Sequence, residues 1–258
     1  MLVKVITSES NDYNKFLKSL TGSKGIKENK QFILSGTKLI NEFFEKKLTR
    51  FKVVDLVYHS DDWSSLSTAA DSLNKTVIPK SVFKEVDIIG TNEPLLVLEF
   101  KPFEEKNFSD PIFDLELIAP IGDPRNLGAL IRSGVGFGIN EIILTQETTH
   151  PFLPHSVKAS AGAVLYANFK KTNLKISEIP LVEENFALDL EGSDITNTKW
   201  PKNLRLWVGE EGPGLKLTPD QRNKMNFISI STNRIESLNA TVSATIAIWE
   251  WNKSLKSK

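Results

Sequence analysis

The stretch that decides the fold is Leu206-Trp-Val-Gly-Glu-Glu-Gly-Pro-Gly-Leu215, followed further along by Ile228-Ser-Ile-Ser-Thr-Asn-Arg-Ile-Glu-Ser-Leu-Asn239. In each stretch an apolar strand runs into a polar loop with few large side chains. Backbone that ends a strand among glycines can approach a ligand closely. Two such loops followed by a helix predict a pocket that is lined by backbone.

A third stretch, Asp123-Pro-Arg-Asn-Leu-Gly-Ala-Leu-Ile-Arg132, follows the apolar strand predicted over 115–120. Asn126 suits a helix N-cap, and Gly128 leaves the first turn bare so that another backbone can pack there. Arg132 lies one turn after Gly128 on the same helical face. It is predicted to project beside the C-terminal end of the strand, where open α/β sheets bind ligands. The alternative is an exposed arginine with no role.

The glycines of Gly134-Val-Gly-Phe-Gly138 resemble half of a dinucleotide-binding fingerprint. Phosphate binding requires such glycines between a strand and a helix, whereas these lie at the end of a predicted helix. They are therefore interpreted as the end of that helix, before a strand predicted over 141–144.

The last predicted helix, over 239–251, follows Glu236-Ser-Leu-Asn239, in which Ser237 or Asn239 can cap it. One face of this helix carries small residues and permits close approach by another segment, of the same chain or of a second subunit: Ala240, Ser243, Ala244 and Ala247. The larger apolar side chains form a stripe: Val242, Ile246 and Trp249.

Strand and helix patterns alternate along the chain, which predicts an α/β fold with a mainly parallel sheet in the second domain. Residues 1–102 are predicted to form a small α/β domain, 103–112 a linker rich in charge and proline, and 113–258 the second domain. Strands are predicted over 30–36, 51–58, 94–100, 115–120, 141–144, 204–208 and 227–230, and helices over 37–45, 63–74, 127–137 and 239–251.

Composition bounds the class of protein without identifying it. A chain of 258 residues with 40% hydrophobic and 25% charged residues predicts a globular protein of two domains. The chain has no cysteine, which excludes disulfides and thiol catalysis, and its three histidines are too scattered to predict a metal site. No signal peptide or apolar run of membrane-spanning length is found, so a cytoplasmic protein is expected.

The net charge is zero, but residues 1–50 hold ten basic and five acidic residues. This local excess indicates an anionic partner such as RNA. The alternative is a solvated surface rich in lysine.

Taken in order, the three stretches resemble the three motifs of the SPOUT superfamily, in its SpoU (TrmH-like) branch of RNA ribose 2′-O-methyltransferases. The matching segments are Asn126-Leu-Gly-Ala-Leu-Ile-Arg132, Trp207-Val-Gly-Glu-Glu-Gly-Pro-Gly214, and Ile228-Ser-Ile230 with Ser237-Leu-Asn239. Lys158-Ala-Ser-Ala-Gly-Ala163 also resembles a segment common in this branch. The resemblance covers residues 113–254. Phe32-Ile-Leu-Ser-Gly-Thr-Lys-Leu-Ile40 resembles, less specifically, a small L30e-type RNA-binding domain.

The resemblance implies an enzyme that methylates a ribose 2′-hydroxyl of rRNA or tRNA, with S-adenosylmethionine as cofactor. It further implies a trefoil knot in the second domain and a homodimer through that domain. Carried over by motif, the cofactor-binding residues are Gly209, Ile230 and Leu238, and the catalytic residues are Arg132, Asn126, Glu211, Ser237 and Asn239.

One departure from the family pattern concerns the loop near the cofactor, where Ser231-Thr232 stands in place of Pro-Met. The main alternative function is an inactive RNA-binding protein that keeps the fold; the presence of Asn126, Arg132 and Asn239 together argues against it. A Rossmann-type oxidoreductase would require a glycine fingerprint after the first strand of the domain, and none is found.

Overall fold

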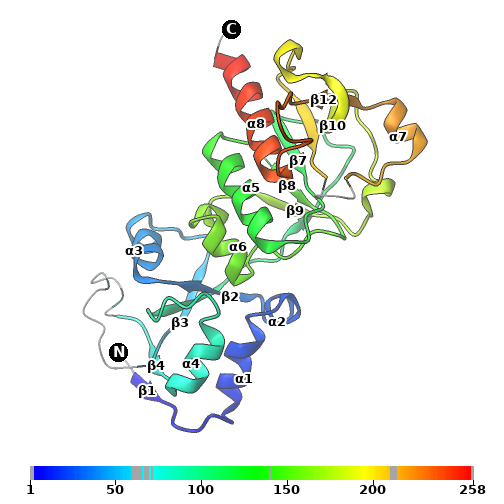
Figure 1. Ribbon diagram of the computed structural model, residues 1–258. Coiled ribbons are helices and arrows are strands. Elements are labelled where there is room, and N and C mark those ends of the chain that lie inside the picture. The colour runs from blue at the N-terminus through cyan, green and yellow to red at the C-terminus, as the bar shows by residue number, and fades with distance from the viewer. Residues whose placement is uncertain are drawn as a thin grey trace. The chain divides into compact units, whose positions relative to one another are not determined.

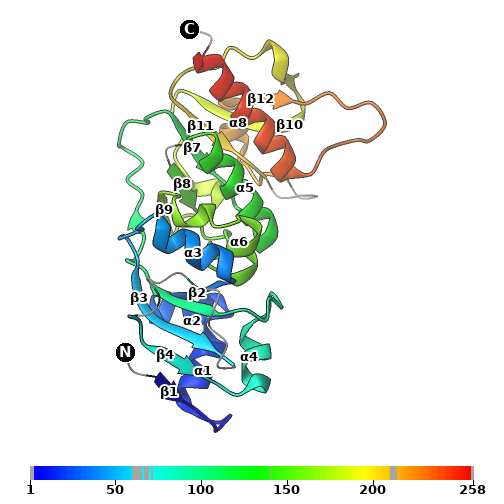
Figure 2. The ribbon, with the colours of Figure 1, turned by 90° about the vertical axis from the view of Figure 1, so that its left-hand side faces the viewer.

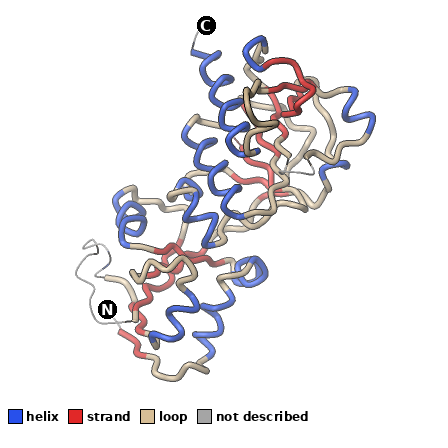
Figure 3. The backbone as a smooth tube through the Cα atoms, in the orientation of Figure 1, coloured by secondary structure: helices blue, strands red, loops and turns tan. Residues whose placement is uncertain are grey.

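The computed structural model describes residues 3–59, 66, 70, 72–139, 141–209 and 214–256. The chain divides into two compact units, the first comprising Met1–Pro102 with His150–Leu165 and the second Phe103–Thr149 with Tyr166–Lys258. In each unit the strands form a central layer with helices beside it (Figure 3). None of the helices within these described ranges is both long and apolar enough to cross a membrane.

The first unit is built on a five-stranded mixed sheet in the order β1-β4-β3-β5-β2 (Figure 1). Strands β1, β4 and β3 are parallel, whereas β5 runs antiparallel to both β3 and β2. The strands are β1 (Val3–Val5), β2 (Gln31–Ser35), β3 (Lys52–Tyr58), β4 (Lys75–Val77) and β5 (Leu95–Glu99). The helices are α1 (Asp12–Ser19), α2 (Ser23–Asn29), α3 (Thr37–Glu45), α4 (Lys80–Val86) and, from further along the chain, α6 (Pro154–Ala159).

The predicted strand over 30–36 and helix over 37–45 are confirmed as β2 and α3, which meet at Gly36. The φ of Gly36 is 97°, a left-handed conformation that favours glycine and allows the chain to turn directly from strand to helix. The strands predicted over 51–58 and 94–100 are confirmed as β3 and β5. The helix predicted over 63–74 lies largely outside the described residues.

Strand β2 is buried on both of its faces. Ile33 belongs to a core cluster with apolar residues of α1 and α4, whereas Phe32 stacks on Phe152 with ring centroids 4.2 Å apart. Helix α6 contacts β2 as well. Residues 150–165, which were predicted to belong to the second domain, therefore pack with the first unit. The reason is the stacking of Phe152 on Phe32, two residues that are far apart in the sequence.

The second unit is a seven-stranded sheet in the order β12-β10-β11-β7-β8-β9-β6. Every neighbouring pair is parallel, which confirms the predicted mainly parallel sheet. The strands are β6 (Glu104–Glu105), β7 (Leu115–Ile118), β8 (Glu141–Leu144), β9 (Phe169–Lys171), β10 (Asn185–Asp194), β11 (Leu204–Trp207) and β12 (Asn226–Ser229), and the helices are α5 (Pro124–Gly136), α7 (Pro219–Asn223) and α8 (Ala240–Lys256).

Two layers cover this sheet. Helices α5 and α8 lie side by side along one face (Figures 1 and 2). Side chains alternate along each strand, so Leu117 and Leu206 point to the face opposite that of Ile118 and Trp207. Ile118 and Trp207 belong to a core cluster with Met225, which follows α7. Both faces of the sheet are therefore buried, as expected for parallel strands.

Residues 103–112, predicted to be a linker, contribute a strand to the second unit. Strand β6 pairs in parallel with β9 at the edge of the sheet, and the Lys106 N–H donates to the carbonyl oxygen of Lys171 over 2.8 Å. Because a strand this short carries no periodic pattern, its pairing could not be inferred from the sequence.

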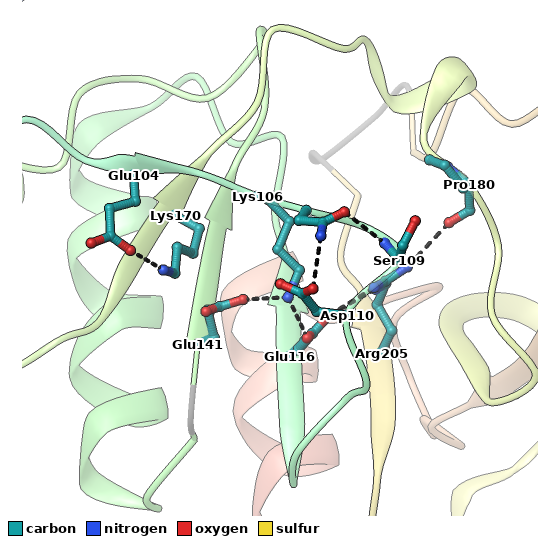
Figure 4. Close-up of polar contacts among 10 residues, drawn as sticks. Glu104, Lys106, Ser109, Asp110, Glu116, Glu141, Lys170, Pro180 and Arg205 are labelled. Carbon is teal, nitrogen blue, oxygen red and sulfur yellow. Dashed lines mark hydrogen bonds and ion pairs between the residues drawn. The ribbon is translucent and has the colours of Figure 1, made fainter.

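Lys106 also anchors this segment through a buried network of four charges (Figure 4). Its Nζ lies 2.5 Å from Glu116 Oε1 and 2.6 Å from Glu141 Oε2. Arg205 Nη2 lies 2.8 Å from the other Glu116 oxygen, and its guanidinium also donates to the carbonyl of Pro180. Two positive and two negative side chains thus balance near the N-terminal ends of β7, β8 and β11.

The N-terminus of helix α5 differs from the prediction, whereas its C-terminus agrees with it. Its N-cap is Asp123, whose Oδ1 accepts from the N–H of Asn126 over 3.0 Å; the prediction that Asn126 caps the helix is wrong. At the other end Gly138 has a φ of 78°, and the N–H of Ile139 donates back to the carbonyl of Gly134. The glycines end the helix, as predicted.

The small-residue face of α8 packs closely against another segment of the same chain, which is one of the two possibilities that the sequence left open. Ala244 and Ala247 of the small-residue face are fully buried, and α8 packs against α5 of the same chain, where Thr245 Oγ1 donates to Ser133 Oγ over 2.8 Å. Val242 and Trp249 of the apolar stripe are 48% and 44% exposed. Small residues face inward because they allow the two helix backbones to approach closely.

Candidate functional site

A pocket of about 470 Å³ lies at the C-terminal ends of β10, β11 and β12. Its size is typical of a small-molecule site, and its place is the one at which parallel α/β sheets bind ligands. Its described walls come from β10 and its bulge, the end of β11, residues 214–215, α7, β12 with the loop after it, and the start of α8. The lining residues are Leu188–Glu191, Val208, Gly209, Gly214, Leu215, Arg222, Phe227–Ile230, Ser237, Leu238, Ala240 and Ser243.

A wide bulge in β10 forms the first wall. The pairing of β10 with β12 shifts between Leu188 and Ser193, so residues 189–192 leave the ladder. Gly192 closes the bulge against β12, since a Cβ there would lie 2.5 Å from the backbone nitrogen of Ile228. Ser229 Oγ donates to the Gly192 carbonyl over 2.9 Å. The bulged segment is thus held by close backbone packing and by one hydrogen bond.

The end of β11 forms the second wall, and it requires glycine at position 209. A Cβ on Gly209 would lie 2.7 Å from the carbonyl carbon of Gly214 and 2.8 Å from the nitrogen of Leu215. Both are backbone atoms, so no flexible side chain could move aside. The backbone of Gly214 and Leu215 therefore packs directly on the bare backbone of Gly209, as the sequence predicted. Glu211 lies outside the described residues.

The third wall is the loop after β12, which contains the departure Ser231-Thr232. Ser231 Oγ donates to Asp194 Oδ2 over 2.7 Å, and Thr232 Oγ1 donates to the carbonyl of Ile235 within the loop. Hydrogen bonds from Thr196 and Ser231 hold the pKa of Asp194 below its ordinary value. The two hydroxyls thus tie this loop to the end of β10 and close it on itself.

The pocket brings together four of the predicted cofactor-binding and catalytic residues: Gly209, Ile230, Ser237 and Leu238. They come from two segments that are distant in the chain, and each contributes to the same cavity. Their roles in cofactor binding and catalysis remain predictions.

Three other predicted residues do not line this pocket. Arg132 is exposed on α5, and Asn126 is half-buried, with its carbonyl accepting from Thr241 Oγ1 of α8 over 3.3 Å. Asn239 caps α8, since its Oδ1 accepts from the N–H groups of Thr241 and Val242 over 3.0 and 3.2 Å. The cap confirms the structural role expected for Asn239 and fixes its side chain beside the pocket residue Leu238.

Sequence reasoning missed the wall that β10 and α7 supply. Asp189 Oδ2 lies 3.3 Å from Arg222 Nη2, and the guanidinium also stands over the ring of Phe227 at 4.9 Å. Gly192 was the available signal, because a glycine inside a strand pattern often marks a bulge. Strand β10 itself was not predicted.

Comparison with known proteins places these motifs in a family. Residues 117–249 match the model of the SpoU rRNA Methylase family. A ribosomal RNA small subunit methyltransferase from Syntrophobacter fumaroxidans is 31% identical over 255 residues, which cover 96% of this chain and 49% of that protein. A 23S rRNA (guanosine(2553)-2′-O)-methyltransferase from Bacillus subtilis is 22% identical over 251 residues, covering 96% of this chain and 98% of that protein.

Solved structures share the fold. The AdoMet-bound rRNA methyltransferase from Sinorhizobium meliloti has a TM-score of 0.76 at 24% identity and covers 98% of both chains. A SpoU methyltransferase from Streptomyces viridochromogenes in complex with AdoMet has a TM-score of 0.78 at 18% identity, covering 96% of this chain and 99% of that one. The chain spans about half the length of the Syntrophobacter relative, so the name of that protein assigns no substrate here.

Proposed function

The chain belongs to the SpoU rRNA methylase family, and from this premise we propose that it is an RNA methyltransferase that uses S-adenosylmethionine to methylate a ribose 2′-hydroxyl of rRNA or tRNA. The observation that carries the proposal is the pocket at the C-terminal ends of β10, β11 and β12. Two of the three family motifs contribute to its walls, and it has the volume of a small-molecule site.

The pocket fits this cofactor in one specific respect. Gly209 leaves bare backbone where any side chain would meet Gly214 and Leu215, so main-chain N–H and C=O groups line the cavity. We assign Gly209, Ile230 and Leu238 to binding of the cofactor. When bound, S-adenosylmethionine supplies an electrophilic methyl group on a sulfonium, which an oxygen nucleophile can attack in line.

The residues of the chain then have two tasks, to align the ribose and to stabilise the oxygen as its proton leaves. We assign the second task to Arg132, whose exposed guanidinium can bind a neighbouring phosphate or a developing alkoxide as a planar cationic fork. A guanidinium stays protonated, which argues against its acting as the base. Asn126, Glu211, Ser237 and Asn239 are assigned to orienting the ribose and Arg132.

Arg132 and Asn126 do not line the pocket, which supports a site completed by a second copy of the chain. We propose a homodimer through the second unit, with the exposed Val242 and Trp249 of α8 in the contact. Sedimentation analysis should find a dimer at micromolar concentration, and replacing Trp249 with Glu should shift it toward monomer. A wild-type monomer under these conditions would contradict the proposal.

We also propose that residues 1–102 form an L30e-like domain that binds RNA, and that the second unit holds the trefoil knot of the family. The excess of basic residues within positions 1–50 supports the first point. The neighbouring position of β10 and β12, with α8 as the next element after β12, supports the second. Filter binding of tRNA and rRNA fragments with and without substitutions of Lys46 and Lys47 tests the RNA-binding role.

The central test is the Arg132→Ala variant. Transfer of labelled methyl groups to RNA should fall by at least about 100-fold, the usual scale for loss of a positioned electrostatic group. The affinity for S-adenosylmethionine, measured by calorimetry, should stay unchanged, because Arg132 does not line the pocket. Arg125→Ala, another exposed arginine of α5, is the matched control. Near-normal methylation by the Arg132 variant refutes the assignment.

The same calorimetric titration separates an enzyme from an inactive RNA-binding protein that keeps the fold. Binding of S-adenosylmethionine by the wild-type chain supports the enzyme, and its absence supports the alternative. Mapping 2′-O-methyl groups in RNA from cells that lack the protein would then identify the methylated nucleotide.

A further inference from the structure

Three charged residues occur among the described residues that line the pocket: Asp189, Glu191 and Arg222. Asp189 and Arg222 form an ion pair with 3.3 Å between Oδ2 and Nη2, and Arg222 also stands over the ring of Phe227. Their charges therefore compensate each other at one end of the cavity. The described walls keep a net charge of −1, and that charge belongs to Glu191.

Glu191 differs from Asp189 in its surroundings. Its backbone N–H donates to Asp189 Oδ1 over 3.1 Å, but its carboxylate has no hydrogen bond or ion pair within the described part of the chain. The residue that follows, Gly192, is packed against the backbone of β12 and accepts a hydrogen bond from Ser229. The backbone that carries Glu191 is thus fixed at the pocket, while its carboxylate remains available to a cationic ligand.

The charge of the cofactor changes in the reaction proposed above. S-Adenosylmethionine carries a sulfonium, an ammonium and a carboxylate, so its net charge is +1. On transfer the methyl carbon bonds to the ribose oxygen, the electron pair of the C–S bond returns to sulfur, and the hydroxyl proton passes to solvent. The product S-adenosylhomocysteine is a neutral thioether with a net charge of zero. A negative pocket therefore attracts the substrate form more than the product form.

We propose that Glu191 is a specificity-determining residue that makes the pocket favour the sulfonium cofactor over the thioether product. The inference rests on the proposed function, since it presumes that this pocket binds S-adenosylmethionine. The attraction between the Glu191 carboxylate and the sulfonium is lost when the methyl group leaves. The product is therefore released more readily and inhibits the enzyme more weakly.

The test measures the affinities of the full chain for S-adenosylmethionine, S-adenosylhomocysteine and sinefungin by calorimetry. Sinefungin has an amine in place of the sulfonium centre, so it reports on charge without a transferable methyl group. In Glu191→Gln the affinities for the two cationic ligands should fall by about three- to tenfold, the scale of a partly screened charge pair. The affinity for S-adenosylhomocysteine should stay within about twofold.

Two further variants separate this role from general effects. Glu191→Asp keeps the charge and should keep the preference for the sulfonium form. Glu183→Gln makes the same charge change at an exposed position that does not line the pocket, and it should leave all three affinities unchanged. Raising the salt concentration should reduce the preference in the wild type and have little effect on it in Glu191→Gln.

The outcomes distinguish the inference from the proposed function. If the wild-type chain binds none of the three ligands, the proposed function fails and the inference fails with it. If the wild type binds S-adenosylmethionine but Glu191→Gln weakens all three ligands equally, the proposed function stands and Glu191 is a structural residue only. An equal loss of preference in Glu183→Gln overturns the inference as well.

Discussion

Replacing Glu116 with Gln should destabilise the second unit strongly. Its carboxylate accepts from Arg205 Nε and Nη2 over 3.0 and 2.8 Å and from Lys106 over 2.5 Å, and the side chains of Glu116 and Arg205 are only 3% and 0% exposed. The variant removes one of two negative charges, so Glu141 still pairs with Lys106 but Arg205 loses its carboxylate partner in the network. An uncompensated charge left by breaking a buried pair costs about 3–5 kcal/mol.

The magnitude can be measured by thermal and urea unfolding. For a protein of this size each kcal/mol lowers the melting temperature by roughly 2–4 °C, so the expected decrease is about 6–20 °C. Glu105→Gln is the matched control, because the Glu105–Lys171 pair is 57% and 45% exposed and should contribute at most about 1 kcal/mol. Equal effects of the two variants would refute the reasoning.

The network lies near the N-terminal ends of its strands, whereas the pocket lies at the C-terminal ends of β10, β11 and β12. Below its unfolding transition the Glu116 variant should therefore bind S-adenosylmethionine with wild-type affinity. A large loss of affinity without a loss of stability would show that the network acts on the pocket and not only on the stability of the sheet.

The remaining predictions concern the pocket loop, a helix cap and a buried histidine. Gly209→Ala should weaken S-adenosylmethionine binding by about 100-fold, the scale of a misplacement near 1 Å, because the new Cβ would lie 2.7 Å from a backbone atom. The control is Gly136→Ala, whose new Cβ would have no atom within 4 Å, and its affinity measured by calorimetry should stay unchanged. Asn239→Ala should cost about 1 kcal/mol in urea unfolding through loss of the α8 cap, and no measurable change would contradict that role. Burial lowers the pKa of His150 from 6.5 to about 3. The contribution of the neutral His150 to the free energy of unfolding should therefore be fully present above pH 6.5. It should decrease as the pH falls toward 3, by up to about 1.4 kcal/mol per pH unit. Unfolding at pH 7 and pH 5 checks this, and an equal decrease in His150→Asn would disprove it.

Local patterns in the sequence predicted many of the elements. The strands over 141–144 and 204–208 were found because each is a short apolar segment, and the last helix because a capping residue precedes an apolar helical pattern. Strand β10 was missed because its bulge interrupts the alternation, and β6 because two residues show no period. The helix cap moved from Asn126 to Asp123, since either side chain suits a cap and only the backbone decides between them.

The sequence by itself determined the pocket-lining glycine at 209 and the apolar residues around it, because a close backbone turn after a strand admits no other residue there. Tertiary structure alone decided which face of α8 is buried, that residues 150–165 pack with the first unit, and that Asp189 and Arg222 form an ion pair in the pocket wall. The physical reason is the range of the interactions. Periodicity and turn chemistry act over a few residues. Helix packing, aromatic stacking and ion pairs join side chains that are far apart in the sequence, and neither local segment shows which distant residue it will contact.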